Sequence, residues 1–289
     1  MGFSIKELTY NHKPILYLTK QELAGPWVSF NILEDNIGAL PIILKNIEPT
    51  PIYKLINSRK GKSIDRITLD FDINAYLNQN INQILLQPIK LKKNESEYIR
   101  LYIDIFSEPH LPYINTYFTF KNISSYNLID FNIYFIFDFD INGLEGYDND
   151  LSGYDKKKDI IYQYDKTNIH AGFSPISKST YYETCLTNDF HIDSTKKKLS
   201  NTLYNHPGEI LSALQIEFKT LKPFQTFQTA LTISGGYNRE ELIENISNGK
   251  IKAIKYLKQV NRNIKSRQRN KQEEAFQKLN LQRVKDCSS

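Results

Sequence analysis

The chain has 289 residues, of which 40% are hydrophobic and 12% aromatic, so it can bury one large core or two ordinary ones. Its formal net charge of +5 arises at one end: twelve basic and three acidic residues from Lys250 onward give +9, whereas the 25 basic and 29 acidic residues before it give −4. Two cysteines, Cys185 and Cys287, argue against a disulfide framework, and no segment has the roughly 20 apolar residues of a membrane span.

The body of the chain alternates apolar and polar side chains with a period of two, which is typical of β-strands with one buried face. In 98–106, Ile99 and Leu101 point to one side, and Arg100 and Tyr102 point to the other. Strands are predicted, in chain order, at 27–33, 64–73, 84–91, 98–106, 113–122, 128–141, 159–164, 180–186, 214–219 and 227–233. Because no helical periodicity intervenes, we predict a mainly β fold, a large two-sheet antiparallel sandwich followed by C-terminal helices, and not a doubly wound α/β fold.

The pattern changes after Gly235 and Gly236, where the strands give way to a basic helical sequence. The predicted domains are therefore a β-supersandwich at 1–236 and a basic helical C-terminal segment at 237–289.

A helix is predicted to begin at Asn238, because Glu241 follows three residues later as in a capping box. Gly249 is expected to end or bend this helix, since glycine is the poorest helix former after proline. Apolar residues then recur at spacings of three and four over 251–264, which predicts a second helical stretch.

The sharpest local motif is acidic. Asp138, Asp140 and Asn142 alternate before a glycine, and Asp148 follows. Oxygen ligands converging in one tight turn are what Ca²⁺ requires, so these four residues are a candidate calcium loop, and calcium is the only cofactor suggested. An EF-hand is disfavoured because Asn149 occupies the position of the closing glutamate. The alternative is a solvated acidic loop after a core strand.

No catalytic constellation is found in the sequence. Ser174, close to His170, lacks the second glycine of a nucleophile elbow. His191 and Asp193 are predicted to share one face of a strand, but no further zinc ligand stands at a suitable spacing. Residues 60–63 lack the first glycine of a phosphate-binding loop and are expected to form a basic hairpin turn. The sequence thus favours a protein without a catalytic site of its own, and enzymatic activity stays open.

The N-terminal residues 1–6 lack the basic region and the continuous apolar run of a secretory signal. With so few cysteines, a reducing compartment fits best. We therefore expect a cytoplasmic protein without a membrane span.

The basic C-terminal segment has three interpretations. Its positive groups contact nucleic-acid phosphates, or they bind a membrane surface or an acidic partner protein, or they stay solvated while an apolar seam docks on the body.

Several segments together resemble a known family. Their order along the chain is similar to that in the N-terminal β-supersandwich of prokaryotic glucoamylase-type glycoside hydrolases, a fold shared with galactose-mutarotase-like domains. The resemblance covers residues 20–248 and is carried by the segments at 115–122, 134–143, 154–155, 160–165, 171–174, 207–215 and 221–236.

In such enzymes the catalytic carboxylates lie in a following helical barrel, for which the 39 residues after Lys250 leave no room. The resemblance therefore implies a non-catalytic, carbohydrate-associated binding or accessory domain, with an α-glucan or oligosaccharide as ligand, or a partner of a separately encoded barrel. Exposed Tyr and Phe side chains on the sheet are expected to stack on sugar rings. The binding residues are not specified.

Two other functions remain open at this point. The first is a mutarotase-like sugar epimerase that uses His110, His170 or His191 beside a carboxylate on the concave sheet. The second is a protein that binds nucleic acid or another protein through the basic C-terminal segment.

Overall fold

The computed structural model describes residues 7–17, 24–34, 38–44, 53–59, 64–72, 97–107, 110–193 and 195–286. Contacts divide the chain into two compact units, Met1–Lys250 and Ile251–Ser289. Within the described residues, the first unit contains the strands and the first turns of the helix α3 (Arg239–Asp286). The second unit consists of the remainder of that helix.

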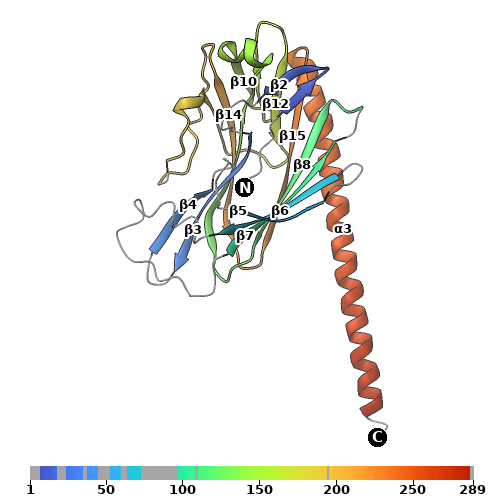
Figure 1. The fold of residues 1–289 in the computed structure, drawn as a ribbon. Coiled ribbons are helices and arrows are strands. Elements are labelled where there is room, and N and C mark those ends of the chain that lie inside the picture. The colour runs from blue at the N-terminus through green and yellow to red at the C-terminus, as the bar shows by residue number, and fades with distance from the viewer. Residues whose placement is uncertain are drawn as a thin grey trace. The chain divides into compact units, whose positions relative to one another are not determined.

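The larger sheet has eight strands in the order β10-β11-β12-β15-β8-β7-β6-β5, and the paired neighbours are antiparallel (Figure 1). The strands are β5 (Tyr53–Arg59), β6 (Ile64–Asp72), β7 (Glu97–Phe106), β8 (Tyr113–Asn122), β10 (Leu151–Asp155), β11 (Ile160–Tyr164), β12 (His170–Pro175) and β15 (Thr226–Gly236).

The second sheet has five antiparallel strands in the order β13-β14-β9-β3-β4. They are β3 (Ala24–Glu34), β4 (Gly38–Leu44), β9 (Leu128–Asp138), β13 (Tyr181–Leu186) and β14 (Ile210–Leu221). A separate hairpin is formed by β1 (Glu7–Tyr10) and β2 (Lys13–Tyr17), and three short 3₁₀ turns are η1 (Gly143–Glu145), η2 (Tyr147–Asn149) and η3 (Thr187–Asp189).

The main core lies between the two large sheets. Aromatic rings from both sheets meet there: Phe118 of β8 lies 5.3 Å from Phe135 of β9, and Phe137 of β9 lies 4.7 Å from Phe173 of β12 between ring centroids. All four side chains are fully buried. Two antiparallel sheets packed over a shared core confirm the predicted mainly β sandwich.

The outer face of the five-stranded sheet, which points away from this core, is partly covered as well. Trp27, Tyr134 and Leu211 form a second buried cluster there with Leu199, which belongs to the loop after η3. Strand β9 is therefore buried on both faces, which explains its long apolar run.

Most strands lie where alternation predicts them, and the predicted strand at 113–122 coincides with β8. Strand β9 ends at Asp138 and not at residue 141, because the chain turns there toward η1. The short strands β1, β2, β4, β5, β10 and β12 carry too little alternation to have been predicted. The predicted strand at 84–91 and the turn at 60–63 lie outside the described residues.

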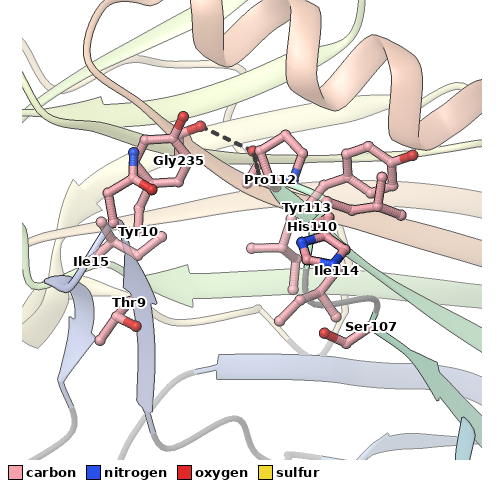
Figure 2. Close-up of a pocket in the computed structure, with 13 residues that line it drawn as sticks. Thr9, Tyr10, Ile15, Ser107, His110, Pro112, Tyr113, Ile114 and Gly235 are labelled. Carbon is pink, nitrogen blue, oxygen red and sulfur yellow. Dashed lines mark hydrogen bonds between the residues drawn. The ribbon is translucent and has the colours of Figure 1, made fainter. Parts of the chain in front are cut away.

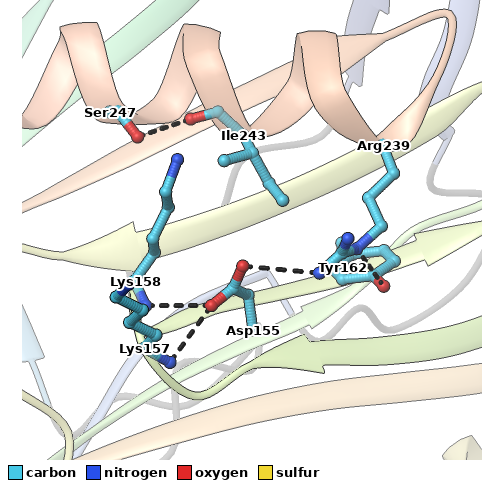
Figure 3. A network of polar contacts seen from close by, with 7 residues as sticks. All are labelled: Asp155, Lys157, Lys158, Tyr162, Arg239, Ile243 and Ser247. Atoms are coloured by element: carbon cyan, nitrogen blue, oxygen red, sulfur yellow. Dashed lines mark hydrogen bonds and ion pairs between the residues drawn. The ribbon is translucent and has the colours of Figure 1, made fainter.

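Helix α3 begins as predicted. Asn238 Oδ1 accepts a hydrogen bond of 2.8 Å from the backbone N–H of Glu241, and Glu241 Oε2 accepts one of 2.8 Å from Tyr237. Arg239 then joins the helix to β10 and β11: it donates to Tyr162 at 3.0 Å and forms an ion pair of 3.4 Å with Asp155 (Figure 3). Leu242, Ile243 and Ile246 pack on the outer face of the eight-stranded sheet, against Ile160 and Tyr162.

Gly249 was predicted to end or bend the helix, with a second helix after it. The predicted end and the separate second helix were wrong, because α3 is one helix from Arg239 to Asp286. Gly249 serves close packing instead. A β-carbon at this position would lie 2.3 Å from Thr232 Cγ2 and 3.0 Å from the Tyr113 ring. In addition, the Gly249 carbonyl accepts a hydrogen bond of 3.1 Å from Asn115. The glycine therefore lets the helix approach β8 and β15.

No helix in the described part of the chain is both long and apolar enough to cross a membrane. Cys185 is a free thiol whose burial raises its pKa to about 12, and Cys287 lies outside the described residues.

Candidate functional site

The outer face of the five-stranded sheet carries a polar cavity of about 540 Å³ beyond the apolar cluster around Trp27. Its polar lining comes from three strands and one loop: Asn31 of β3, Asp130 and Asn132 of β9, Glu217 and Lys219 of β14, and residues 195–198 of the loop after η3. We call this cavity the lysine pocket.

Strand alternation brings these polar residues to one face. Asn132 lies opposite Ser29 of β3 on one side and opposite Glu217 of β14 on the other. The neighbouring residues Phe131 and Phe218 belong to or pack against the core between the sheets. The outer face of the five-stranded sheet is therefore polar at the lysine pocket and apolar at the cluster around Trp27.

A β-bulge on β9 places Asp130 at the pocket. Ser29 pairs with Asn132 and Asn31 pairs with Ile129, so two residues of β9 lie opposite one residue of β3. Asp130 has a φ of 49°, a left-handed conformation that Asp adopts more readily than most residues. Bulges often redirect a side chain at a functional site, and here the Asp130 carboxylate accepts a hydrogen bond of 2.9 Å from Asn31 Nδ2.

Lys197 extends this pair to a row of three side chains. Its Nζ donates a hydrogen bond to Asn31 Oδ1. The side chain is 4% exposed, and burial lowers the pKa of Lys197 to about 8, while the charge of Asp130 opposes that shift. The row Asp130–Asn31–Lys197 therefore offers a carboxylate, an amide and an amine in fixed positions.

A buried network holds the backbone of Lys197. Its carbonyl accepts hydrogen bonds from the Tyr134 hydroxyl at 2.7 Å and from Gln215 Nε2 at 2.8 Å. Gln215 also donates to Asn132 Oδ1 at 3.0 Å, and its own Oε1 accepts a bond of 2.9 Å from the N–H of Leu199. The loop is consequently fixed to β9 and β14 on the strand side of the pocket.

The other end of the loop is fixed by Asp193. Its carboxylate accepts hydrogen bonds of 2.8 Å from the backbone N–H groups of Thr195 and Lys196, and these bonds lower its pKa. The prediction that His191 and Asp193 share a strand face was wrong, because both lie in the loop after η3 and both are exposed. The Nδ1 atom of His191 lies 3.2 Å from the Asp189 carbonyl.

The charge of the lysine pocket is predominantly positive. Lys196, Lys198 and Lys219 are exposed and line it together with Lys197, and its acidic lining residues are Asp130 and Glu217. Four ammonium groups against two carboxylates leave an excess of two positive charges. Lys198 also lies 5.3 Å from the centre of the Tyr181 ring, and a side-chain hydrogen bond to Tyr181 raises its pKa.

A second cavity, of about 570 Å³, lies between the β1–β2 hairpin and the segment that leads into β8 (Figure 2). We call it the hairpin pocket. Figure 2 shows Tyr10 of the hairpin facing His110 and Ile114 across it. The Tyr10 hydroxyl donates a hydrogen bond of 2.6 Å to Glu241. Burial, together with this hydrogen bond, raises the pKa of Tyr10 to about 12. His110 is exposed, and no carboxylate stands among the described lining residues.

The remaining sequence candidates do not form an active site. His170 stacks on Tyr164 at 5.0 Å, and burial lowers its pKa. Ser174 is fully buried, its hydroxyl donates to the Asp159 carbonyl, and it accepts a hydrogen bond of 2.6 Å from Lys250 Nζ. Both residues therefore have structural partners.

The four residues of the candidate calcium loop occupy different environments. Asp138 is buried at the end of β9, and burial raises its pKa well above the usual value, with a further contribution from Asp140. Asn142 precedes η1 with a φ of 65°, and Asp148 is exposed. Across the described residues, no three His, Cys, Asp or Glu side chains converge as metal ligands would. Calcium binding here stays a prediction.

Exposed aromatic side chains do not mark a sugar-stacking surface on the described strands. Phe224, 67% exposed, lies in the turn between β14 and β15, and Tyr237, 44% exposed, precedes α3. Neither lines the lysine pocket or the hairpin pocket. Recognition in the lysine pocket would depend on hydrogen bonds and charge.

Sequence reasoning missed the central residues of the lysine pocket. Glu217 and Lys219 lie in the strand predicted at 214–219, but Asn31, Asp130 and Lys197 were not singled out. The available signal was the run of three lysines at 196–198, which begins three residues after Asp193, a residue type that is able to cap a turn.

No protein-family model and no curated protein matches this sequence. Among solved structures, a bacterial glucoamylase complexed with acarbose is similar to the chain, with a TM-score of 0.50 and 10% identity over 90% of this chain and 37% of that one. A kojibiose phosphorylase from the human microbiome has a TM-score of 0.39 and 12% identity, covering 89% of this chain and 28% of that one. A galactose 1-epimerase from Lactobacillus acidophilus has a TM-score of 0.39 and 8% identity, covering 81% and 89%.

Because the sequence identities are this low, the similarity to these structures concerns the fold alone. The chain spans between 28% and 37% of the length of the glucoamylase, a polysaccharide lyase and the phosphorylase. Its described residues contain one α-helix and no helical barrel. The expected resemblance to the β-sandwich of glucoamylase-type enzymes is therefore confirmed as a shared fold.

Proposed function

We propose that this chain is a carbohydrate-associated binding or accessory domain without hydrolase activity of its own. The observation that carries the proposal is the row Asp130–Asn31–Lys197 in the lysine pocket, on a fold similar to that of a glucoamylase. A sugar ring presents hydroxyls that both donate and accept. The row supplies an acceptor, a mixed amide and a donor, held before any ligand arrives.

The size and rigidity of the pocket support this function. Ligand pockets typically enclose about 300 to 1,000 Å³, and the lysine pocket encloses about 540 Å³. Because the network around Gln215 fixes the loop in advance, binding would require little ordering of the loop backbone.

The described part of the chain supports a binding role, because it contains one α-helix and no helical barrel on a fold similar to that of a glucoamylase. A partner protein that supplies catalytic groups is part of the proposal.

The test is an oligosaccharide panel, with neutral and acidic members, titrated by calorimetry against the whole chain and against Asn31→Ala. We expect at least one oligosaccharide to bind, and we expect Asn31→Ala to weaken it about tenfold, since the variant removes a donor and an acceptor from the row. Asn127→Ala is the control, because this exposed asparagine lies outside the pocket.

Two results would contradict the proposal: no binding to any member of the panel, or equal affinity in Asn31→Ala and the unaltered chain. Thermal unfolding of both variants shows whether the fold is retained.

A mutarotase-like epimerase is the second candidate, and His110 in the hairpin pocket is the observation that favours it. Such a reaction needs a carboxylate beside the histidine, and none stands among the described lining residues. Anomer exchange followed by NMR, in the unaltered chain and in His110→Gln, tests this alternative. Exchange that is lost in the variant would replace the binding proposal.

A further inference from the structure

We propose that the lysine pocket selects saccharides that carry an anionic group, a carboxylate, sulfate or phosphate, over neutral ones. The inference rests on the proposed carbohydrate-binding function and adds the chemical class of the ligand. It is carried by the charge of the pocket and by the way the loop at 195–198 is fixed.

The excess positive charge comes from different elements that surround one cavity. Lys196 and Lys198 belong to the loop, and Lys219 belongs to β14, directly beside the acidic Glu217. A hollow lined mainly by charges of one sign concentrates their field, so an anion is attracted more strongly there than by a single lysine on an open surface. An anionic ligand would neutralise the positive charge that the two acidic lining residues do not balance.

The position of the lysines is built into the fold. Lys197 has a φ of 51°, its carbonyl is held by Tyr134 and Gln215, and its Nζ is held by Asn31. With Asp193 fixing the preceding turn, the backbone of three consecutive lysines is held at the pocket without a ligand. A backbone fixed in advance in this way lowers the cost of ordering the loop when an anion binds.

The acidic lining residues favour a saccharide over a free anion or a polyanion. Asp130 and Glu217 accept hydrogen bonds from hydroxyls, whereas they repel the closely spaced phosphates of a nucleic acid. A ligand with one anionic group and several hydroxyls can form ion pairs with the lysines and donate hydrogen bonds to the carboxylates. Free phosphate can pair with the lysines but offers few hydroxyls to the carboxylates.

The experiment compares matched ligands on the whole chain. Calorimetry at low salt measures the affinities for galacturonate and galactose oligomers of equal length, for glucose 6-phosphate, glucose 6-sulfate and glucose, and for inorganic phosphate. We expect the acidic member of each set to bind about tenfold more tightly than the neutral one, and inorganic phosphate to bind more weakly than the acidic sugars.

Charge-matched variants locate the preference. The triple variant Lys196→Gln, Lys198→Gln, Lys219→Gln changes exposed side chains, and we expect it to lose the preference for acidic sugars while it still binds neutral ones. The control Lys265→Gln, Arg267→Gln, Arg269→Gln removes the same number of positive charges from the basic C-terminal segment. We expect this control to keep the preference.

Each contrary outcome has a distinct meaning. Equal affinity for acidic and neutral sugars would overturn this inference and leave the proposed function standing, whereas the absence of all saccharide binding would overturn both. Inorganic phosphate binding as tightly as the acidic sugars would make the site one for free anions. Loss of the preference in the C-terminal control alone would assign the preference to the basic C-terminal segment and overturn this inference.

Discussion

Asp150 is a carboxyl group that the fold takes out of water without satisfying both of its oxygens. It is 1% exposed, its Oδ2 accepts a hydrogen bond of 3.3 Å from Ile141, and its Oδ1 has no partner among the described residues. The pKa of Asp150 is raised to about 9, mainly by burial, with smaller contributions from the charges of Asp165, Asp140 and Asp138 and with the hydrogen bond from Ile141 opposing the shift. This group is therefore protonated at neutral pH.

The protonation of Asp150 predicts how stability depends on pH. An unfolded Asp has a pKa near 3.8, so unfolding between that value and pH 9 releases a proton, and stability falls as pH rises. The limiting slope is about 1.4 kcal/mol per pH unit. Asp150→Asn cannot ionise and keeps an oxygen for Ile141, so we expect a flatter dependence when urea unfolding is measured at several pH values across this window.

Asp148→Asn is the matched control, since Asp148 lies in the same loop but is exposed. It should leave the slope as it is. A slope in Asp150→Asn as steep as in the unaltered chain would show that Asp150 is ionised in the folded state.

At the level of elements, the turn between β14 and β15 stores backbone strain. The N–H of Gln225 donates a hydrogen bond of 3.0 Å to the Lys222 carbonyl. This bond closes a four-residue turn with Pro223 and Phe224 at its centre. Phe224 has a φ of 60°, and because Pro223 cannot adopt a positive φ, the turn is of type II. Type II turns favour Gly at this position, so a large residue here is costly.

Replacing Phe224 with Gly should therefore stabilise the protein, by about 1 kcal/mol relative to Phe224→Ala. Alanine removes the exposed ring but keeps the strain, so the comparison isolates the backbone. Urea unfolding measures both variants. If the two are equally stable, the left-handed conformation carries no cost in this turn.

The contact of Gly249 with β15 sets helix propensity against packing. Propensity alone predicts that Gly249→Ala stabilises a helix by about 1 kcal/mol. The added β-carbon would lie 2.3 Å from Thr232, too close for any real contact, so we expect a loss of about 1 to 3 kcal/mol instead. The measurement is the free energy of unfolding in urea.

Thr232→Ser tests the cause of that loss. It removes the methyl group that the new β-carbon would meet, while its hydroxyl still donates to Asn115. The double variant should therefore recover part of the stability lost in Gly249→Ala. Strictly additive losses would mean that another contact, such as the Tyr113 ring, decides the effect.

At the level of the whole molecule, the sequence predicts the architecture better than the site. Alternation along 98–106 and 113–122 records which face of each strand is buried, and this is a local property. Asn31, Asp130 and Lys197 are distant in sequence and meet only after β3, β9 and a loop have packed together. No short sequence motif therefore predicts that these three side chains lie together.

Two further features were hidden for physical reasons. A run of lysines normally indicates a solvated segment, and only tertiary structure shows that Lys197 is 4% exposed. Gly249 looked like a helix terminator because propensity is a local quantity, whereas its packing against Thr232 is not. In both cases a tertiary contact overrode the local rule.

The bulge at Asp130 has a consequence for how this site can change over time. Strand β9 runs in continuous register with β14, while against β3 it carries one additional residue. Insertions and deletions usually accumulate in loops, but a single-residue deletion in β9 would make the pairing with β3 regular while it shifts the pairing with β14. Side chains beyond the deletion would turn to the opposite face of the sheet, so the loss of one codon inside a core strand is expected to abolish the site.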